Sequence, residues 1–275
     1  MPNGKIVRKA FPYANVVATG QATNQLMIGK TINEIELKLG GTSLTKAMLS
    51  MVRVKANAKT IVEGSGAQLE AINAYRGHTA NAAFLHIPFE DLSGLDQADR
   101  YVGALDTSIG IANLTTEVDI AGATAPTLSA RVHEAAPQRN ADGSQAAYAG
   151  LIAKTLRYPF SVASAGDLPL NFPFGPNTGA IIKRVHVFAS TVTGAVVKEN
   201  GVVVHESLKA ENDAFNVRNG RVPQADVYTI DFIPDGNVRN ALDTRRAQSM
   251  DWIFTHSGAG TGTVLIEYID RLGNL

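Results

Sequence analysis

The sequence predicts an all-β protein made of two tandem β-sandwiches, with short helices in the loops. Three observations predict this class. Short segments alternate apolar and polar residues, which is typical of strands with one buried face. Turn residues separate these segments at short intervals, as they do in sandwiches. The second half of the chain also repeats the first, so each half is expected to form a similar unit.

The repeat is clearest when residues 52–77 are laid without gaps on residues 195–220. Eight of the 26 aligned positions are identical, whereas ordinary residue usage would give about two. The identical pairs are Val54/Val197, Lys55/Lys198, Asn57/Asn200, Glu63/Glu206, Ala67/Ala210, Ala71/Ala214, Asn73/Asn216 and Gly77/Gly220. One supersecondary design is therefore expected twice in the chain.

A length of 275 residues suits two domains of ordinary size. We expect an N-terminal arm (residues 1–30), a first sandwich (31–135), a connector (136–179) and a second sandwich (180–275). The arm alternates basic and apolar residues without a helical period. It is interpreted either as a frayed terminus or as a segment that docks on a neighbour or on an anionic membrane surface.

Alternation of apolar and polar residues places the strands. In the first half they are expected at Glu34–Leu39, Met51–Lys55, Lys59–Glu63, Ala83–Phe89, Ile109–Ala112 and Thr115–Ile120. In the second half they are expected at Val185–Phe188, Val196–Lys198, Val202–His205, Val227–Ile233, Asp251–Thr255 and Thr263–Asp270. The charged or polar residues Glu36, Lys38, Arg184 and His186 are expected to face outward, toward solvent or an interface.

Each half contains a predicted hairpin turn. Asn200-Gly201 lies between two apolar runs and is the strongest short-range hairpin signal, because both central residues tolerate a positive φ. The equivalent turn in the first half is Asn57-Ala58, where alanine fits less well.

Short helices are expected between the strands, at Ala67–Tyr75 and Lys209–Val217 and near Leu95–Ala104 and Val238–Arg246. In the connector, Ala146–Arg157 is interpreted as a helix. Leu168–Phe174, which contains two prolines, is interpreted as a rigid extended segment that enters the second sandwich.

Composition excludes several classes of protein. The 25 basic and 25 acidic residues give zero net charge, which argues against a general electrostatic grip on nucleic acid. The absence of cysteine excludes disulfides, thiolate metal sites and a cysteine nucleophile. No apolar run is long enough to span a membrane. Charged residues make up only 18% of the chain, which fits either a low-charge protein or one whose surface is buried against copies of itself.

Motifs that carry chemistry are weak. The glycine-rich run at residues 258–262 precedes a strand rather than a helix, so we interpret it as a loop and not as a phosphate cradle. The histidines show no metal-ligand spacing; they are His78, His86, His133, His186, His205 and His256. Acidic residues recur at equivalent places, Glu90 and Asp91 in the first half and Asp231 and Asp235 in the second. They are either turn carboxylates or loop oxygens that could bind calcium.

Several segments together resemble the double jelly-roll major capsid protein of corticovirus-type phages, which are tailless, icosahedral phages with an internal membrane. In the second half the resemblance lies in residues 228–236, YTIDFIPDG, and 265–268, LIEY. In the first half it lies in residues 110–120, GIANLTTEVDI, and 128–130, LSA. The similarity covers roughly residues 25 to 275 in order and pattern; the first 25 residues and the middle of the connector do not match.

The resemblance implies that each half is an eight-stranded jelly roll, so that the chain is a double jelly roll of two tandem jelly-roll β-sandwiches. It implies a homotrimer whose six jelly rolls form a pseudo-hexagonal tile of an icosahedral shell around an internal membrane. The partners would be neighbouring capsomers, other capsid proteins and the viral membrane, with no sequence-specific binding of nucleic acid. The chain would be made in the host cytoplasm and reside in the virion. Family members can carry calcium, but no motif here assigns a ligand residue.

Two alternatives to the capsid subunit stay open at this point. A glycan-directed hydrolase would need a cleft with paired carboxylates, and Glu90, Asp91, Asp231 and Asp235 are the candidates. A carbohydrate-binding or receptor-binding virion protein would need exposed aromatic residues, and the single tryptophan, Trp252, lies within a predicted strand. For the capsid protein we expect no enzymatic activity and no catalytic, cofactor-binding or metal-binding residue.

Overall fold

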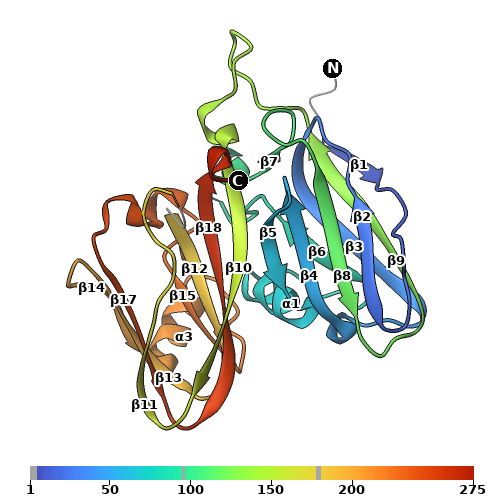
Figure 1. The fold of residues 1–275 in the computed structure, drawn as a ribbon. Coiled ribbons are helices and arrows are strands. Elements are labelled where there is room, and N and C mark those ends of the chain that lie inside the picture. Colours follow the sequence, from blue (N-terminus) through green and yellow to red (C-terminus); the bar gives the residue numbers. More distant parts are fainter. Residues whose placement is uncertain (1–4, 95–96, 178–180) are drawn as a thin grey trace.

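The computed structural model describes residues 5–94, 97–177 and 181–275. Figure 1 shows two β-sandwiches side by side, the first drawn in blue to green and the second in yellow to red. Each has its own apolar core, with Ile35, Val54 and Val118 in the first and Val185, Val197 and Trp252 in the second.

The first sandwich packs two four-stranded antiparallel sheets face to face. One has the strand order β1-β9-β3-β6 and the other β5-β4-β8-β2; the two-residue strand β7 pairs with β3. The strands are β1 (Ile6–Lys9), β2 (Gly20–Gln25), β3 (Thr31–Ser43), β4 (Leu49–Ala56), β5 (Lys59–Gly64), β6 (Phe84–Pro88), β7 (Leu105–Asp106), β8 (Leu114–Ile120) and β9 (Thr124–Ala135). The helices are η1 (Lys46–Met48), α1 (Gly66–Tyr75) and α2 (Gln97–Tyr101).

The second sandwich repeats this order strand by strand. Its sheets are β15-β12-β18-β10, with β16 pairing with β12, and β11-β17-β13-β14. The strands are β10 (Leu151–Val162), β11 (Gly166–Leu170), β12 (Ile181–Phe188), β13 (Val192–Glu199), β14 (Val202–Leu208), β15 (Val227–Asp231), β16 (Leu242–Asp243), β17 (Met250–His256) and β18 (Gly260–Arg271). The helices are η2 (Ala147–Gly150), α3 (Lys209–Arg218), η3 (Val238–Asn240), η4 (Thr244–Arg246) and η5 (Leu272–Asn274).

Both sandwiches are therefore jelly rolls, and the predicted double jelly roll is confirmed. Strand for strand, β1 to β9 correspond to β10 to β18, and α1 corresponds to α3. Apart from the two-residue strands β7 and β16, each half contributes eight strands within the described residues. This is the number that the family resemblance implies.

The repeated hairpin turns have the same geometry in both halves. Asn57 and Ala58 have φ of 49° and 66°, and Asn200 and Gly201 have φ of 50° and 81°, so both turns have positive φ at both central residues as predicted. The asparagine side chains also play the same role. Asn57 Oδ1 accepts a hydrogen bond from the backbone amide of Ala112 at 2.8 Å, and Asn200 Oδ1 accepts one from Gln248 at 2.7 Å.

A second repeated asparagine ties each helix to its sheet. Asn73 Nδ2 donates to the carbonyl of His86 at 2.8 Å, and Asn216 Nδ2 donates to the carbonyl of Thr229 at 3.1 Å. Both asparagines are buried, so each bond satisfies a polar group that would otherwise be costly to bury. The predicted helices at Ala67–Tyr75 and Lys209–Val217 are confirmed by α1 and α3.

The two sandwiches are joined through a continuous sheet. β10 lies parallel to β5, with Thr155 opposite Val62, and this pairing fuses two sheets into one nine-stranded sheet that includes β16. Figure 1 shows β5 and β10 side by side at the centre of the molecule. The first strand of the second jelly roll thus extends the edge of the first.

The structure differs from the expectations for the arm and the connector. In the expected arm, β1 pairs with β9 and β2 pairs with β8, so its described part belongs to the first sandwich. In the expected connector, β10 pairs with β18 and β11 with β17, so these strands belong to the second sandwich. Residues 1–4 of the arm and 178–179 of the connector lie outside the described residues.

Two local predictions are wrong. The helix expected at Ala146–Arg157 is only the short η2 followed by strand β10, because backbone pairing with β18 along the whole of β10 outweighs local helix propensity. Ile109–Ala112 forms bends rather than a strand. Of the two weaker helical segments, Leu95–Ala104 contains α2, although residues 95–96 lie outside the described part, and Val238–Arg246 contains η3 and η4.

Candidate functional site

The most heavily charged buried region is the junction between the two sandwiches. The outward face of β12 and β18 does not meet solvent, since it lies against α1, β5 and the loop after β6 of the first sandwich. Both faces of these two strands are consequently buried. Charged side chains in this setting must be paired, because an isolated buried charge is strongly unfavourable.

Arg184 on β12 is the centre of the junction and is fully buried. Its Nη1 donates to Asp91 Oδ2 at 2.9 Å and lies 3.3 Å from Glu267 Oε2, and its Nε donates to Asp231 Oδ2 at 3.0 Å. Asp91 belongs to the first sandwich, whereas the other two carboxylates belong to the second. One guanidinium therefore binds acidic groups from both halves of the chain.

The C-terminal end of α1 supplies the return contacts. Arg76 Nη2 donates to Glu267 Oε2 at 2.5 Å, and the hydroxyl of Tyr75 donates to Asp231 Oδ2 at 3.1 Å. The Tyr75 ring also meets the His186 ring edge-on, with 5.5 Å between centroids. The backbones of the two sandwiches are also hydrogen-bonded here, since the amide of Val222 donates to the carbonyl of Tyr75 at 2.9 Å.

These contacts fix the protonation states within the junction. Burial alone would raise the pKa of Asp91 and Glu267, but the facing guanidinium groups hold both well below their ordinary values. Burial lowers the pKa of Arg184, yet its three carboxylate partners hold it well above the ordinary value. Burial also lowers the pKa of His186, against the opposing effect of Glu267. The junction is therefore a set of fixed ions around a neutral histidine at pH 7.

Arg184 and His186 do point away from the core of their own sandwich, as expected, but the interface that they meet is the junction with the first sandwich of the same chain. Glu36, which occupies the position of His186 in the first sandwich, also points away from the core and pairs with Arg131 at 2.5 Å. Lys38 is exposed, as expected.

The four acidic residues proposed for hydrolysis do not form a paired site. Asp91 and Asp231 are bound to Arg184, and Glu90 accepts from Lys5 at 2.6 Å. Asp235 caps a turn, accepting from the backbone amide of Asn237 at 3.0 Å. Three of the four carboxylates are thus paired with arginine or lysine, and the part of the chain that the structure describes contains no group of three or more His, Asp or Glu residues arranged to hold a metal.

The remaining motifs have structural roles. The glycine-rich run connects β17 to β18 and continues into β18, so its interpretation as a loop between two strands is confirmed. Trp252 is buried in the second core with 1% of its surface exposed, so it cannot serve as a sugar platform. His86 pairs with Glu34, which raises the pKa of the histidine.

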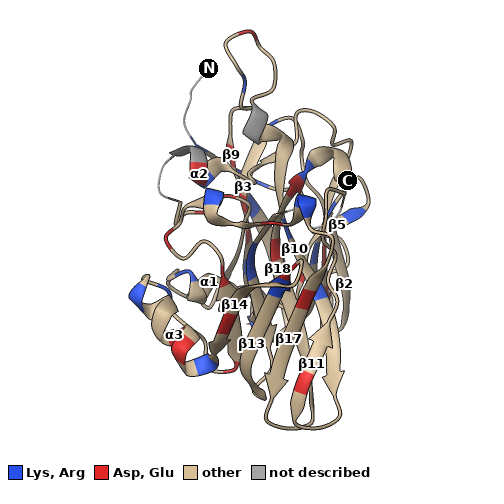
Figure 2. Ribbon diagram, turned by 90° about the vertical axis from the view of Figure 1, so that its left-hand side faces the viewer, with Lys and Arg blue, Asp and Glu red and all other residues tan. Residues whose placement is uncertain are grey.

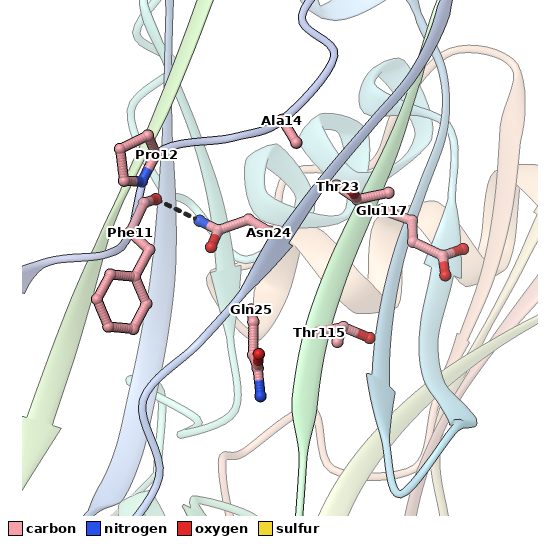
Figure 3. A pocket seen from close by; sticks show the side chains of 8 residues that line it. All are labelled: Phe11, Pro12, Ala14, Thr23, Asn24, Gln25, Thr115 and Glu117. Atoms are coloured by element: carbon pink, nitrogen blue, oxygen red, sulfur yellow. Dashed lines mark hydrogen bonds between the residues drawn. The ribbon is translucent and has the colours of Figure 1, made fainter.

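A surface hollow of about 440 Å³ lies beside the segment that leads from β1 to β2 (Figure 3). Asn24 Nδ2 donates to the carbonyl of Phe11 at 2.8 Å and fixes this segment. Among the residues that line the hollow, Glu117 carries a charge, and its carboxylate is bound by Lys55 at 2.7 Å. The lining therefore offers no pair of carboxylates for catalysis.

Large apolar side chains are exposed at the opposite side of the molecule, on β14, α3 and the loop after α3. They are Val202, Val203, Val204, Leu208, Phe215, Val217 and Val222. Figure 2, which faces this side, shows charged residues scattered singly rather than gathered into one patch. An exposed apolar surface of this kind is typical of a protein–protein contact. Sequence patterning did not identify it, because these valines read as an ordinary strand.

Solved structures with the same fold are viral capsid proteins. The major capsid protein P2 from bacteriophage PM2 matches with a TM-score of 0.86 at 19% identity, covering 98% of each chain. The STIV MCP matches with a TM-score of 0.74 at 14% identity, covering 98% of this chain and 97% of that one. The PBCV-1 virus capsid matches with a TM-score of 0.62 at 12% identity, covering 97% of this chain and 93% of that one. A search of curated proteins finds no match.

The fold is the double jelly roll that these capsid proteins share. Two family models identify the family: the viral coat protein P2 N-terminal domain matches residues 7–134, and the viral coat protein P2 C-terminal domain matches residues 152–272. The chain belongs to the viral coat protein P2 family and is a structural, non-enzymatic component of the virion capsid. Among the described residues, no helix is long and apolar enough to cross a membrane.

Proposed function

We propose that this major capsid protein assembles as a homotrimer, and that the trimer is a pseudo-hexagonal tile of an icosahedral shell around an internal membrane. The observation that supports the tile is the strand-by-strand equivalence of the two jelly rolls. Three chains that each carry two equivalent lobes place six similar lobes around a threefold axis, and such a body packs on a hexagonal net.

Rigidity of the two-lobed chain also supports the proposal. A tile keeps its shape only if its lobes cannot swing, and domains joined by small polar interfaces usually move relative to one another. Here the continuous sheet through β5 and β10 and the ion pairs of Arg184 hold the lobes in one arrangement. The duplicated lobes therefore act as one unit.

The internal membrane is a proposal that rests on the family resemblance. The tile would lie above the vesicle and contact it from one face. Flotation of the purified protein with anionic vesicles tests for direct contact; protein that stays at the bottom of the gradient would mean that other virion components attach the shell.

Light scattering coupled to size exclusion tests the trimer. The proposed assembly has three times the 29.1 kDa mass of one chain. Repeating the measurement with a chelator tests whether metal joins the subunits, since dissociation would indicate metal at the interfaces. A species of single-chain mass at all protein concentrations and ionic strengths would contradict the proposal.

A further inference from the structure

The two jelly rolls use equivalent edges differently, and this difference identifies a surface for a partner. In the first jelly roll, the edge of β5 is covered by β10. The equivalent strand of the second jelly roll is β14, and among the described strands it pairs with β13 alone. Likewise β10 has partners on both sides, whereas its counterpart β1 pairs with β9 alone among them. Two edges thus remain open: that of β14, equivalent to the covered edge of β5, and that of β1, equivalent to the covered edge of β10.

The open edges lie at opposite sides of the molecule. In Figure 1, β14 is at the far left and β1 at the far right, while the joined pair β5 and β10 lies between them. Edges that are complementary and face opposite ways cannot meet within one chain, but they can meet head to tail between copies. Heterologous contacts of this kind close into a ring when their rotation permits.

The surface around β14 has the character of an uncovered junction. Ile72 of α1 lines the same small cavity as Thr155 of β10 and is 4% exposed. Its counterpart on α3 is Phe215, which is 50% exposed. Similarly Ile61, at the bulge of the β4–β5 hairpin, is buried, whereas Val204, at the equivalent bulge of the β13–β14 hairpin, is exposed. The second copy thus exposes apolar groups where the first copy buries them.

We propose that the β14–α3 surface of one chain receives strand β1 of a second copy, in parallel, as β5 receives β10 within the chain. This contact rests on the proposed trimer and specifies its interface. We assign a second copy of this chain as the occupant. Its first jelly roll carries β1, the counterpart of β10, and the outer edge of β1 is unpaired among the described strands. Three repeats of the contact would join three chains into a closed ring of six lobes.

The internal junction also sets the register of the proposed contact. Thr155 lies opposite Glu267 in the β10–β18 pair, and Val7 lies opposite His133 in the β1–β9 pair. Glu267 and His133 are equivalent, since they pair with Arg184 and Glu34 on β12 and β3. Val7 is therefore the counterpart of Thr155. Val7 is 53% exposed, as a residue at an open edge should be.

On the receiving side, the counterpart of Val62 is His205. Val62 lies opposite Val54 in the β4–β5 pair, and His205 lies opposite Val197 in the β13–β14 pair, each next to the bulge. The pair Thr155 and Val62 within the chain thus predicts a pair of Val7 and His205 between chains. Charge supports the match. Within the chain, the ring of Tyr75 contacts His186. The counterparts of these two residues are Arg218 on α3 and Glu36 on β3, which carry opposite charges.

Because the chain contains no cysteine, a disulfide between two introduced cysteines shows directly that Val7 and His205 of different chains are neighbours. Neighbouring strands lie about 4.8 Å apart, and a disulfide spans Cα separations of roughly 4.4–6.8 Å. The full-length chain with Val7→Cys and His205→Cys is oxidised and run on a non-reducing gel. We expect covalent trimers that reducing agent dissolves. The matched control, Val62→Cys with Thr155→Cys, should form a disulfide within one chain and leave its mass on the gel at one chain.

The native mass of the protein distinguishes a failure of this interface from a failure of the proposed trimer. If the unmodified protein is a trimer and the control pair closes but Val7→Cys with His205→Cys gives no covalent trimer, this interface is wrong and the trimer stands. If the unmodified protein is a single chain, the proposed trimer fails and this contact fails with it. A variant without cysteine provides a second readout: Phe215→Glu should lower the native mass to one chain while circular dichroism stays unchanged, whereas a full trimer would overturn the interface.

Discussion

Arg184 of the second sandwich donates to Asp91 of the first at 2.9 Å, with both side chains almost fully buried. This contact joins residues 93 positions apart in the chain. It is the most central bond of a junction that keeps the two lobes of a capsid subunit in one orientation. Its loss should therefore affect both the stability of the chain and the shape of the assembled tile.

Replacing Arg184 with methionine should lower the free energy of unfolding by about 3–5 kcal/mol, because Asp91, Asp231 and Glu267 would be left as poorly compensated buried charges. Urea denaturation followed by tryptophan fluorescence measures this change. The control is Arg245→Ala, which breaks the exposed pair of Arg245 with Asp243 and should cost less than about 1 kcal/mol. Equal effects of the two changes would contradict the assigned role of Arg184.

Gly236 should not tolerate substitution by alanine, because the backbone of the first sandwich lies too close to it. A Cβ atom at this position would lie 2.0 Å from the carbonyl oxygen of Ser93, which belongs to the first sandwich, and φ is +78°. We expect Gly236→Ala to lower the melting temperature clearly and to separate the lobes locally.

Gly201→Ala is the matched control for Gly236. Gly201 has φ of +81°, and a Cβ atom added there would have no neighbour within 4 Å, so only the left-handed backbone cost of about 1–2 kcal/mol applies. The first half already places Ala58 at the equivalent position with φ of 66°. If both variants melt at the same temperature, the close approach at Ser93 does not restrict the junction.

Stability should fall as the pH falls from 7 to 4, in part through His205. Burial lowers the pKa of His205 to about 4 in the folded chain, whereas the unfolded chain keeps an ordinary value near 6.5. Between these values the unfolded state binds more protons, so protonation favours unfolding. His205→Gln should flatten the decline, which denaturation at a series of pH values measures. An identical pH dependence in the variant would show that His205 does not contribute.

His86 should act in the opposite direction. Its hydrogen bond to Glu34 raises its pKa in the folded chain, so its stabilising effect is present below the unfolded value and is lost as the pH rises through the folded value. We therefore expect His86→Gln to be more destabilising at pH 5 than at pH 8. A larger effect at pH 8 would exclude a charged His86–Glu34 pair.

Local patterns predicted the repeated units well. The hairpins at Asn57 and Asn200 and the helices α1 and α3 were predictable because their signals lie within a few residues. β9 was not predicted as a strand of its own, since it pairs with β1 and β3, which are distant in sequence, and contains small residues and a proline. The start of β10 falls in Ala146–Arg157, which the sequence predicts as a helix, for the same reason: the partners of β10, β18 and β5, are remote along the chain.

The junction could not be predicted, because it depends on how the two lobes meet. Arg76 and Glu267 bond across 191 positions, and no local pattern relates them. The available signal was the presence of Lys183, Arg184 and Glu267 inside strands that are otherwise apolar on both faces. Charges in such strands indicate a buried ion cluster rather than a solvated face. The two copies differ here, since Glu36 stands where His186 does.

Electron microscopy of the purified assembly, with projections averaged along its symmetry axis, tests most directly whether three two-lobed chains form a pseudo-hexagonal tile. We expect threefold symmetry with six similar lobes in a closed ring, alternating between first and second jelly rolls. Isolated two-lobed particles, or open chains of lobes that do not close after three copies, would contradict it.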